Sequence, residues 1–209
     1  MVPQQEEEDR GSVGLQYGNL SPEAITGTKP LIILLPGIMG SNLEMNEQKL
    51  WLNYGRIVNG SITRLNINNK DIEATSLVAT SYEDLVEFLK KKEYEVLVFP
   101  YDWRRTTKEA AKKLHNRLRQ ILNANPTPPS IQIVAHSMGG LVVRELILNH
   151  AATWSDLQDL PNFRAILMGT PWRGSYLIPQ TLTGHGDTIR SLQWFSATKP
   201  KKELLQVFN

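Results

Sequence analysis

Apolar residues along the chain gather in short runs that alternate with amphipathic segments. Four runs have the length and the β-branched or aliphatic content of strands, and they cover residues 31–35, 94–99, 131–135 and 163–168. Continuous apolar runs of this kind are typical of strands buried on both faces. Because segments with helical spacing separate them, the pattern predicts an α/β fold with a mostly parallel sheet and helices on both faces.

The spacing of apolar residues predicts three main helices. The first covers residues 81–90, begins with Ser81 as its N-cap, and has one apolar stripe made of Tyr82, Leu85, Val86 and Leu89. The second covers residues 106–122 and turns a basic face outward, at Lys108, Lys112, Lys113, Arg117 and Arg119. Such a face is usually only solvated, although it also suits peripheral contact with an anionic membrane. The third helix follows Ser137 and is expected to end at His150.

The remaining segments have no regular pattern. Residues 44–80 are expected to form loops and short elements on the rim of the sheet, where Trp51 and Leu52 either face an apolar substrate or, as is usual, cover the core. Residues 191–195 suit a lid and residues 202–208 the start of a helix. Residues 1–29 are polar and predict a leader of low order, followed by one globular domain over residues 30–209.

Composition limits the classes of function. The chain has 209 residues, of which 41% are hydrophobic, and this suits a single domain with a proper core. Its net charge of +2 is spread along the chain and predicts no nucleic-acid partner. With no cysteine, the chain has no disulfide and no thiol chemistry. No apolar run approaches the ~18 residues of a membrane span, and no signal peptide is evident, so we expect a cytoplasmic protein.

The candidate chemistry centres on Ser137. It follows the strand over residues 131–135 and precedes a helix that begins with two glycines. A serine on such a sharp turn has an exposed hydroxyl beside the free N–H groups of a helix N-terminus, which is the geometry of an acyl-transferring nucleophile. The residues two before and two after must be small, and Ala135 and Gly139 meet that need. The ordinary alternative is a strand-to-helix connection that merely contains a serine.

A second candidate element follows the first strand. Gly37 and Gly40 allow the backbone to bend closely around a ligand and leave the N–H groups between them free to point into a cavity. In the architecture of a serine elbow, a loop in this place supplies one oxyanion donor, and the residue after the serine supplies the other. We therefore predict Ile38 and Met138 as the oxyanion donors, with Met39 as the alternative to Ile38.

The sequence offers no convincing acid and base for this serine. Asp102 precedes the serine, against the order serine, acid, histidine, so an ion pair with Arg104 is the preferred interpretation. His185 and Asp187 are in reversed order and too close together to form a typical pair. The other histidines do not fit the role of the base either. His115 is expected in a helix upstream, His136 lies beside the serine, and His150 ends a helix.

Four motifs in order give the chain a resemblance to a known family. They are Pro36-Gly37-Ile38-Met39-Gly40-Ser41, Phe99-Pro100-Tyr101-Asp102-Trp103-Arg104, Ala135-His136-Ser137-Met138-Gly139-Gly140 and Gly169-Thr170-Pro171-Trp172-Arg173-Gly174-Ser175. From about Leu31 onward the chain resembles the lecithin:cholesterol acyltransferase family of α/β-hydrolases, in its soluble, bacterial-type, lipase-like branch. Members of that family place the catalytic Asp and His well downstream of the Gly-Thr-Pro segment. The chain is therefore expected to be the N-terminal part of an α/β-hydrolase domain that lacks its C-terminal portion.

The resemblance implies a serine-dependent lipid acyl-ester hydrolase or O-acyltransferase. Ser137 would be its nucleophile, Ile38 and Met138 its oxyanion donors, and a lipid or acyl ester its substrate, with no metal or organic cofactor. The alternatives are a general carboxylesterase or triacylglycerol lipase, and a non-catalytic module that keeps the pocket without the chemistry.

Overall fold

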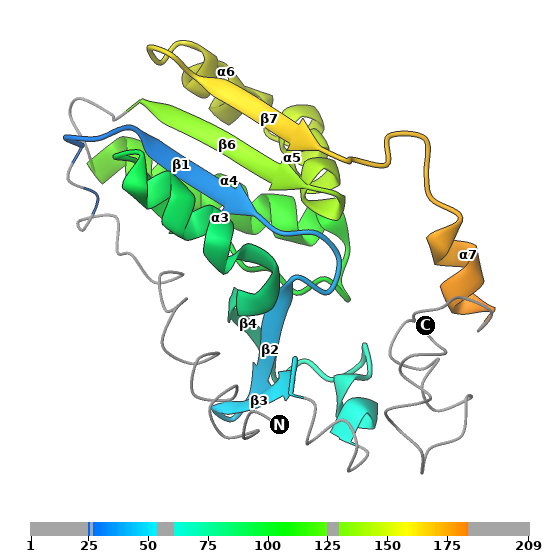
Figure 1. Cartoon of the computed structure of the whole chain (residues 1–209). Coiled ribbons are helices and arrows are strands. Elements are labelled where there is room, and N and C mark those ends of the chain that lie inside the picture. The colour runs from blue at the N-terminus through cyan, green and yellow to red at the C-terminus, as the bar shows by residue number, and fades with distance from the viewer. Residues whose placement is uncertain (1–24, 26, 54–60, 125–129, 184–209) are drawn as a thin grey trace.

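The computed structural model describes residue 25 and residues 27–53, 61–124 and 130–183. Its main sheet consists of β1 (Leu31–Leu35), β5 (Glu95–Val98), β6 (Ile131–His136) and β7 (Arg164–Met168). The strands lie in the order β5-β1-β6-β7 and all pair in parallel, as Figure 1 shows. The four predicted strands and the parallel sheet are thereby confirmed. Their carboxyl ends meet at one edge, the place where open α/β sheets hold their ligands.

The part of the chain that connects β1 to α3 (Ala79–Lys91) forms a second, antiparallel sheet. It contains β2 (Ser41–Met45), β3 (Gln48–Trp51) and β4 (Ile72–Leu77) in the order β3-β2-β4, with η3 (Ser61–Leu65) before β4. The short elements and loops predicted over residues 44–80 are confirmed, but the sequence pattern did not predict that these strands pair into a sheet of their own. The register of β2 shifts at Asn42/Leu43 and Leu43/Glu44. Such bulges break the strict alternation by which a half-buried strand is recognised.

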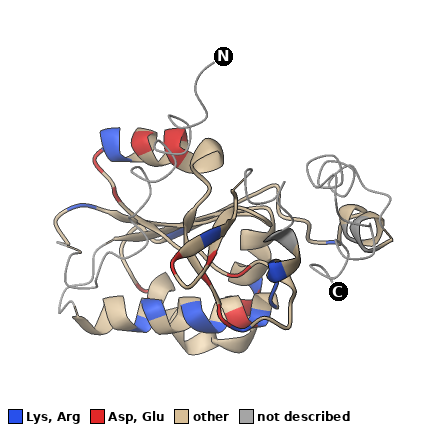
Figure 2. Ribbon diagram, turned by 90° about the horizontal axis from the view of Figure 1, so that it is seen from below, with Lys and Arg blue, Asp and Glu red and all other residues tan. Residues whose placement is uncertain are grey.

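Helices cover both faces of the main sheet (Figures 1 and 2). One face packs against α3 (Ala79–Lys91), and the other against α4 (Thr107–Ala124), α5 (Met138–Asn149) and α6 (Ala151–Gln158). The hydrophobic pattern does not predict α6 or the short α7 (Leu177–Leu182), which lies away from the sheet in Figure 1. The fold, a mostly parallel sheet between two layers of helices, is of the α/β-hydrolase type.

Helix α3 begins two residues before the predicted N-cap. Val78 occupies the N-cap position and no side chain caps the helix, so the assignment of Ser81 was wrong. The N–H of Val78 donates to the carbonyl of Gly40 (2.9 Å), and this bond fixes the end of β4 and starts the helix directly after it. The predicted stripe is confirmed, since Tyr82 and Val86 are buried and Leu85 and Leu89 pack against the same cluster.

The core has two parts because the sheet has two covered faces. Strand β1 is buried along its whole length and alternates between them: Leu31, Ile33 and Leu35 face the larger cluster, and Ile32 and Leu34 face the smaller one beneath α3.

Within residues 1–29, the structure describes residue 25 and residues 27–29. Ile25 belongs to the larger cluster, and Lys29 pairs with Glu93.

Two stacked histidines join α4 to the junction of α5 and α6, on the face of the sheet that carries the larger core cluster. The rings of His115 in α4 and His150 lie 4.3 Å apart at 11°, and His115 Nδ1 is 2.8 Å from Thr153 Oγ1. Loss of solvation, followed by the charges of His150 and Arg119, lowers the pKa of His115. Neutral His115 is therefore favoured in the folded protein.

This lowered pKa gives a stability that depends on pH. Between the folded and unfolded pKa values the unfolded chain binds more protons, so stability falls as pH drops below the ordinary histidine value of about 6.5. Urea unfolding at several pH values between 7.5 and 5 is expected to show this decline, and a His115→Gln variant should show a shallower one. An unchanged slope in the variant would mean that other groups cause the decline.

Candidate active site

Ser137 occupies a strained turn between β6 and α5. Its backbone has φ 50° and ψ −117°, a conformation that residues with a side chain seldom adopt. The turn is held on both sides, because the N–H of Ser137 donates to the carbonyl of Met168 (2.8 Å) and its carbonyl accepts from Gly140 (3.0 Å). The serine stands at the N-cap of α5, yet its side chain makes no capping hydrogen bond. Ser137 is half-buried, and its hydroxyl is not used to hold the helix.

Small residues allow this turn to sit against the end of β1. A Cβ added to Gly139 would lie 2.7 Å from the carbonyl oxygen of Pro36, which is backbone and cannot move aside cheaply. A Cβ on Gly140 would lie 1.9 Å from Thr170 Oγ1, in the segment that follows β7. Ala135 is fully buried. The need for small residues around Ser137 therefore comes from close contact with two neighbouring segments.

Loop 36–41, which follows β1, lies directly against Ser137. A Cβ built on Gly37 would be 3.1 Å from Ser137 Cβ, a tight contact that glycine avoids. The left-handed conformation in this loop belongs to Met39, with φ 61°. Among the hydrogen bonds of the described residues, none occupies the N–H of Ile38 or Met39. Met138 is the first residue of α5, where an N–H has no acceptor within the helix.

Four backbone groups of loop 36–41 are bound by aromatic side chains. Tyr101 Oη donates to the carbonyl of Pro36 (2.8 Å), Trp51 Nε1 to that of Met39 (2.8 Å), and Trp103 Nε1 to that of Ser41 (3.2 Å). The N–H of Gly37 donates to Tyr82 Oη (2.8 Å). Trp51 is 7% exposed, so of the two roles considered for it, covering the core is the correct one and facing substrate is wrong.

The binding of loop 36–41 by these four aromatic residues was not predicted. Tyr101 and Trp103 belong to the Phe-Pro-Tyr-Asp-Trp-Arg motif, so their presence in a family motif was the available signal. Tyr82 fits the apolar stripe of α3, and nothing local in the sequence marks its hydroxyl as a ligand of a distant loop. Tyr101 and Trp103 bind backbone carbonyls of loop 36–41. This explains why the Phe-Pro-Tyr-Asp-Trp-Arg motif contains aromatic side chains that also carry a hydrogen-bond donor.

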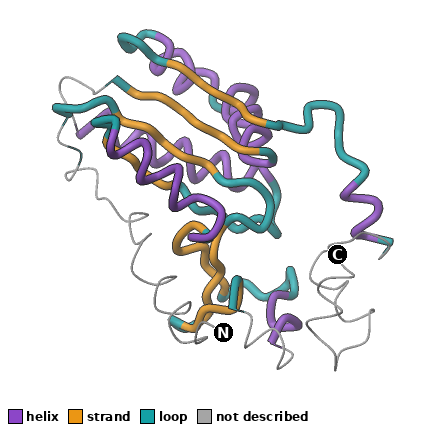
Figure 3. The backbone as a smooth tube through the Cα atoms, in the orientation of Figure 1, coloured by secondary structure: helices purple, strands orange, loops and turns teal. Residues whose placement is uncertain are grey.

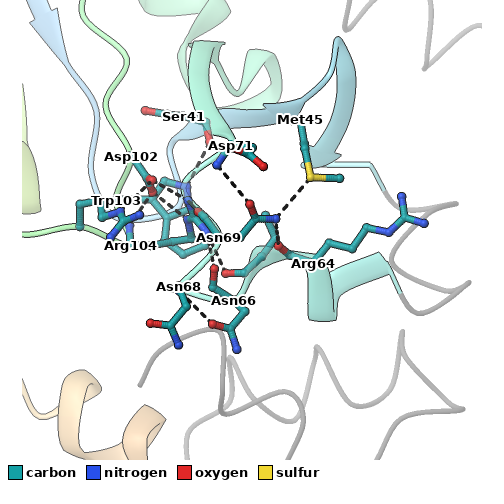
Figure 4. Close-up of polar contacts among 12 residues, drawn as sticks. Ser41, Met45, Arg64, Asn66, Asn68, Asn69, Asp71, Asp102, Trp103 and Arg104 are labelled. Atoms are coloured by element: carbon teal, nitrogen blue, oxygen red, sulfur yellow. Dashed lines mark hydrogen bonds and ion pairs between the residues drawn. The ribbon is translucent and has the colours of Figure 1, made fainter.

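Asp102 and Arg104 form the predicted ion pair. Arg104 Nη2 is 2.6 Å from Asp102 Oδ2 and Nε is 2.9 Å from Oδ1, with the Arg104 side chain wholly buried. The same guanidinium donates to the carbonyls of Leu65, Asn66 and Asn69 (Figure 4). The pair therefore ties the loop after β5 to the segment before β4, and both oxygens of Asp102 are occupied. This confirms the bracing role of Asp102.

The described histidines lie in two different settings. His136 precedes Ser137, and its Nδ1 is 2.9 Å from Tyr82 Oη, while His115 and His150 stack on each other. No hydrogen bond among the described residues joins a histidine to the hydroxyl of Ser137. His185 and Asp187, and the segments 191–195 and 202–208, lie outside the described residues.

Two features are absent from the described residues: a metal-binding cluster and a membrane-spanning helix. Within residues 25, 27–53, 61–124 and 130–183, no group of three or more His, Asp or Glu side chains is arranged to hold a metal ion. In the same part of the chain, no helix combines the length and the apolar character that crossing a bilayer requires. Loops leave the main sheet at the ends of its strands, as Figure 3 shows.

Comparison with known proteins gives two matches. The family model for lecithin:cholesterol acyltransferase matches residues 60–202, a range that includes Ser137 and the Asp102–Arg104 pair but begins after loop 36–41. An uncharacterized protein of Saccharomyces cerevisiae, YJR098C, is 43% identical over 49 residues. That alignment spans 23% of this chain and 8% of the yeast protein.

Proposed function

The chain belongs to the lecithin:cholesterol acyltransferase family, and on that premise we propose that it carries the nucleophile of a serine-dependent lipid acyl-ester hydrolase or O-acyltransferase. The observation that supports this most is the strained backbone of Ser137, whose side chain faces a loop with two unoccupied N–H groups. Backbone strain at one half-buried serine, held by hydrogen bonds on both sides, is typical of a nucleophile elbow.

In the proposed reaction, Ser137 Oγ attacks the carbonyl carbon of an acyl ester. A general base takes the serine proton, and the carbonyl oxygen becomes an oxyanion on a tetrahedral intermediate. The intermediate expels the alcohol, which takes up the proton from the base, and the acyl group stays on Ser137. Attack by water then gives the acid, and attack by a second alcohol gives a new ester. The base and its acid partner are proposed to lie outside the described residues.

The oxyanion is proposed to bind the N–H groups of Ile38 and Met138. The carbonyl of Gly37 accepts from the N–H of Gly40 (3.1 Å), so the N–H of Ile38, on the other side of the same peptide unit, points away from that turn. Met138 contributes the first N–H of α5, at the positive end of the helix dipole. Met39 is the alternative in the loop, because its N–H is also unoccupied by the described residues.

The lipid nature of the substrate is also a proposal. Exposed apolar side chains on the segment after β7 support it: Trp172 is 54% exposed and Tyr176 87%. Aromatic residues of this kind favour the boundary between water and lipid. Peripheral contact with a lipid surface through this segment fits the same observation.

A fluorophosphonate probe tests the proposed nucleophile directly. The probe reacts with activated serines, and we expect mass spectrometry of the digested natural-length protein to find a single phosphonate adduct on Ser137. Protein unfolded in urea serves as the control and should remain unlabelled, because activation needs the folded site. Absence of labelling, or an adduct on another serine, would contradict the proposal.

A second experiment separates acyl transfer from hydrolysis. When a long-chain alcohol is added to an ester substrate, transfer gives a new ester and hydrolysis gives the free acid.

A further inference from the structure

Two buried tyrosine hydroxyls bind one peptide unit of loop 36–41. The carbonyl of Pro36 accepts from Tyr101 Oη, and the N–H of Gly37, on the same peptide unit, donates to Tyr82 Oη, both at 2.8 Å. Tyr82 comes from α3 on one face of the main sheet and is 6% exposed, whereas Tyr101 follows β5, belongs to the other core cluster and is 1% exposed. This peptide unit is therefore held from both faces at once.

Tyr82 has a second partner on the other side of the candidate site. Its hydroxyl oxygen lies 2.9 Å from Nδ1 of His136, the residue before Ser137. We assign the hydroxyl proton of Tyr82 to the bond with His136 Nδ1, because His136 Nδ1 is the acceptor within reach among the described residues, and this assignment places the imidazole proton on Nε2. Burial raises the pKa of Tyr82, so the hydroxyl keeps the proton that it donates.

The two partners of Tyr82 flank the two proposed oxyanion donors. Gly37 directly precedes Ile38, and His136 stands two residues before Met138. A Cβ on Gly40 would lie 2.9 Å from Tyr82 Oη, and a Cβ on Gly37 would lie 3.1 Å from His136 Nδ1. The hydroxyl thus occupies a space that glycines in loop 36–41 leave open, between the loop and the turn that carries the serine.

We propose that Tyr82 is a positioning residue whose hydroxyl joins loop 36–41 to the Ser137 turn and thereby sets the separation of the two oxyanion donors. This inference rests on the function proposed above. The geometry of oxyanion donors matters mainly when charge develops, and loss of one donor typically lowers turnover by ~10²–10³. Loss of a group that only orients a donor should have a smaller effect, and it should reduce kcat rather than raise KM.

The test is a Tyr82→Phe variant, which keeps the ring and removes the hydroxyl. We expect kcat for a chromogenic acyl ester to fall about tenfold and KM to change less than about twofold. Tyr94→Phe is the matched control, because Tyr94 packs against the same core cluster and lies outside the site. Counting active molecules by phosphonate titration removes any unfolded fraction from kcat, so a loss of folding cannot imitate the result.

A spectroscopic measurement gives a second, independent readout. In the wild type, the imidazole ¹⁵N shifts of His136 should report a proton fixed on Nε2, and Tyr82→Phe should shift the tautomer populations. Equal kcat for Tyr82→Phe and Tyr94→Phe would overturn the inference, as would unchanged His136 shifts. If the phosphonate adduct forms on Ser137 and Tyr82→Phe is still fully active, this inference alone fails. If no adduct forms on Ser137, the proposed function fails first.

Discussion

Replacing Ser137 by alanine is expected to lower kcat for acyl-ester cleavage by at least about 10³-fold, because no other group in the turn can form the acyl-enzyme. The backbone around Ser137 should tolerate the change. The bonds that hold the turn come from main-chain atoms of Met168 and Gly140, and the serine side chain does not cap α5. Steady-state kinetics on an ester, together with the midpoint of thermal unfolding, measure the two effects separately.

Ser155→Ala is a suitable control for this loss. Ser155 is an exposed serine in α6, so its removal changes the same chemical group away from the site. We expect Ser155→Ala to keep wild-type turnover. Turnover by Ser137→Ala at the wild-type rate would show that the acyl group is carried by another residue or that water attacks the ester directly.

Replacing Arg104 by methionine is expected to destabilise the fold by about 3–5 kcal/mol, since buried Asp102 would keep only the more distant Arg105, 3.8 Å away, as an ion-pair partner. The Arg104 side chain is fully buried, and its three nitrogens donate to Asp102 and to three carbonyls of the segment before β4. In a domain of this size, that loss corresponds to a fall of about 10 °C in the midpoint of thermal unfolding. Differential scanning calorimetry gives the value.

Lys29→Met provides a control at an exposed ion pair. The Lys29–Glu93 pair has the same N···O distance as Arg104–Asp102, 2.6 Å, but its side chains are 48% and 77% exposed. An ion pair in contact with water contributes little, so Lys29→Met should leave the unfolding midpoint nearly unchanged. Equal effects of the two substitutions would show that burial does not control the strength of the pair.

Much of the main sheet was predictable because its signals are local. Each strand of the main sheet is mostly apolar. Strand β1 is continuously apolar and fully buried, as burial on both faces requires, whereas β7 at the edge of the sheet is largely exposed. The turn at Ser137 was predictable for a similar reason, because small residues two positions before and after it lie within five residues of sequence. The pairing of Asp102 with Arg104 also joins residues two positions apart.

The second sheet and the aromatic ligands of loop 36–41 were not predictable in this way. Shifts of register in β2 conceal its alternation, so residues 44–80 have no regular pattern. Tyr82 binds Gly37 and His136 across 45 and 54 residues of chain. A tyrosine on an apolar stripe gives no indication of which distant backbone group its hydroxyl will bind.

The sequence by itself determined the four strands and three main helices of the parallel-sheet core, the sharp turn at Ser137 and the resemblance to the family. Those features depend on hydrophobic period and on small residues at close spacing, which are properties of neighbouring residues. Only the tertiary structure decided which side chains hold loop 36–41 against that turn. Hydrogen bonds between distant segments form once the sheet and its helices bring those segments together. The local sequence pattern does not show which distant segments will become neighbours.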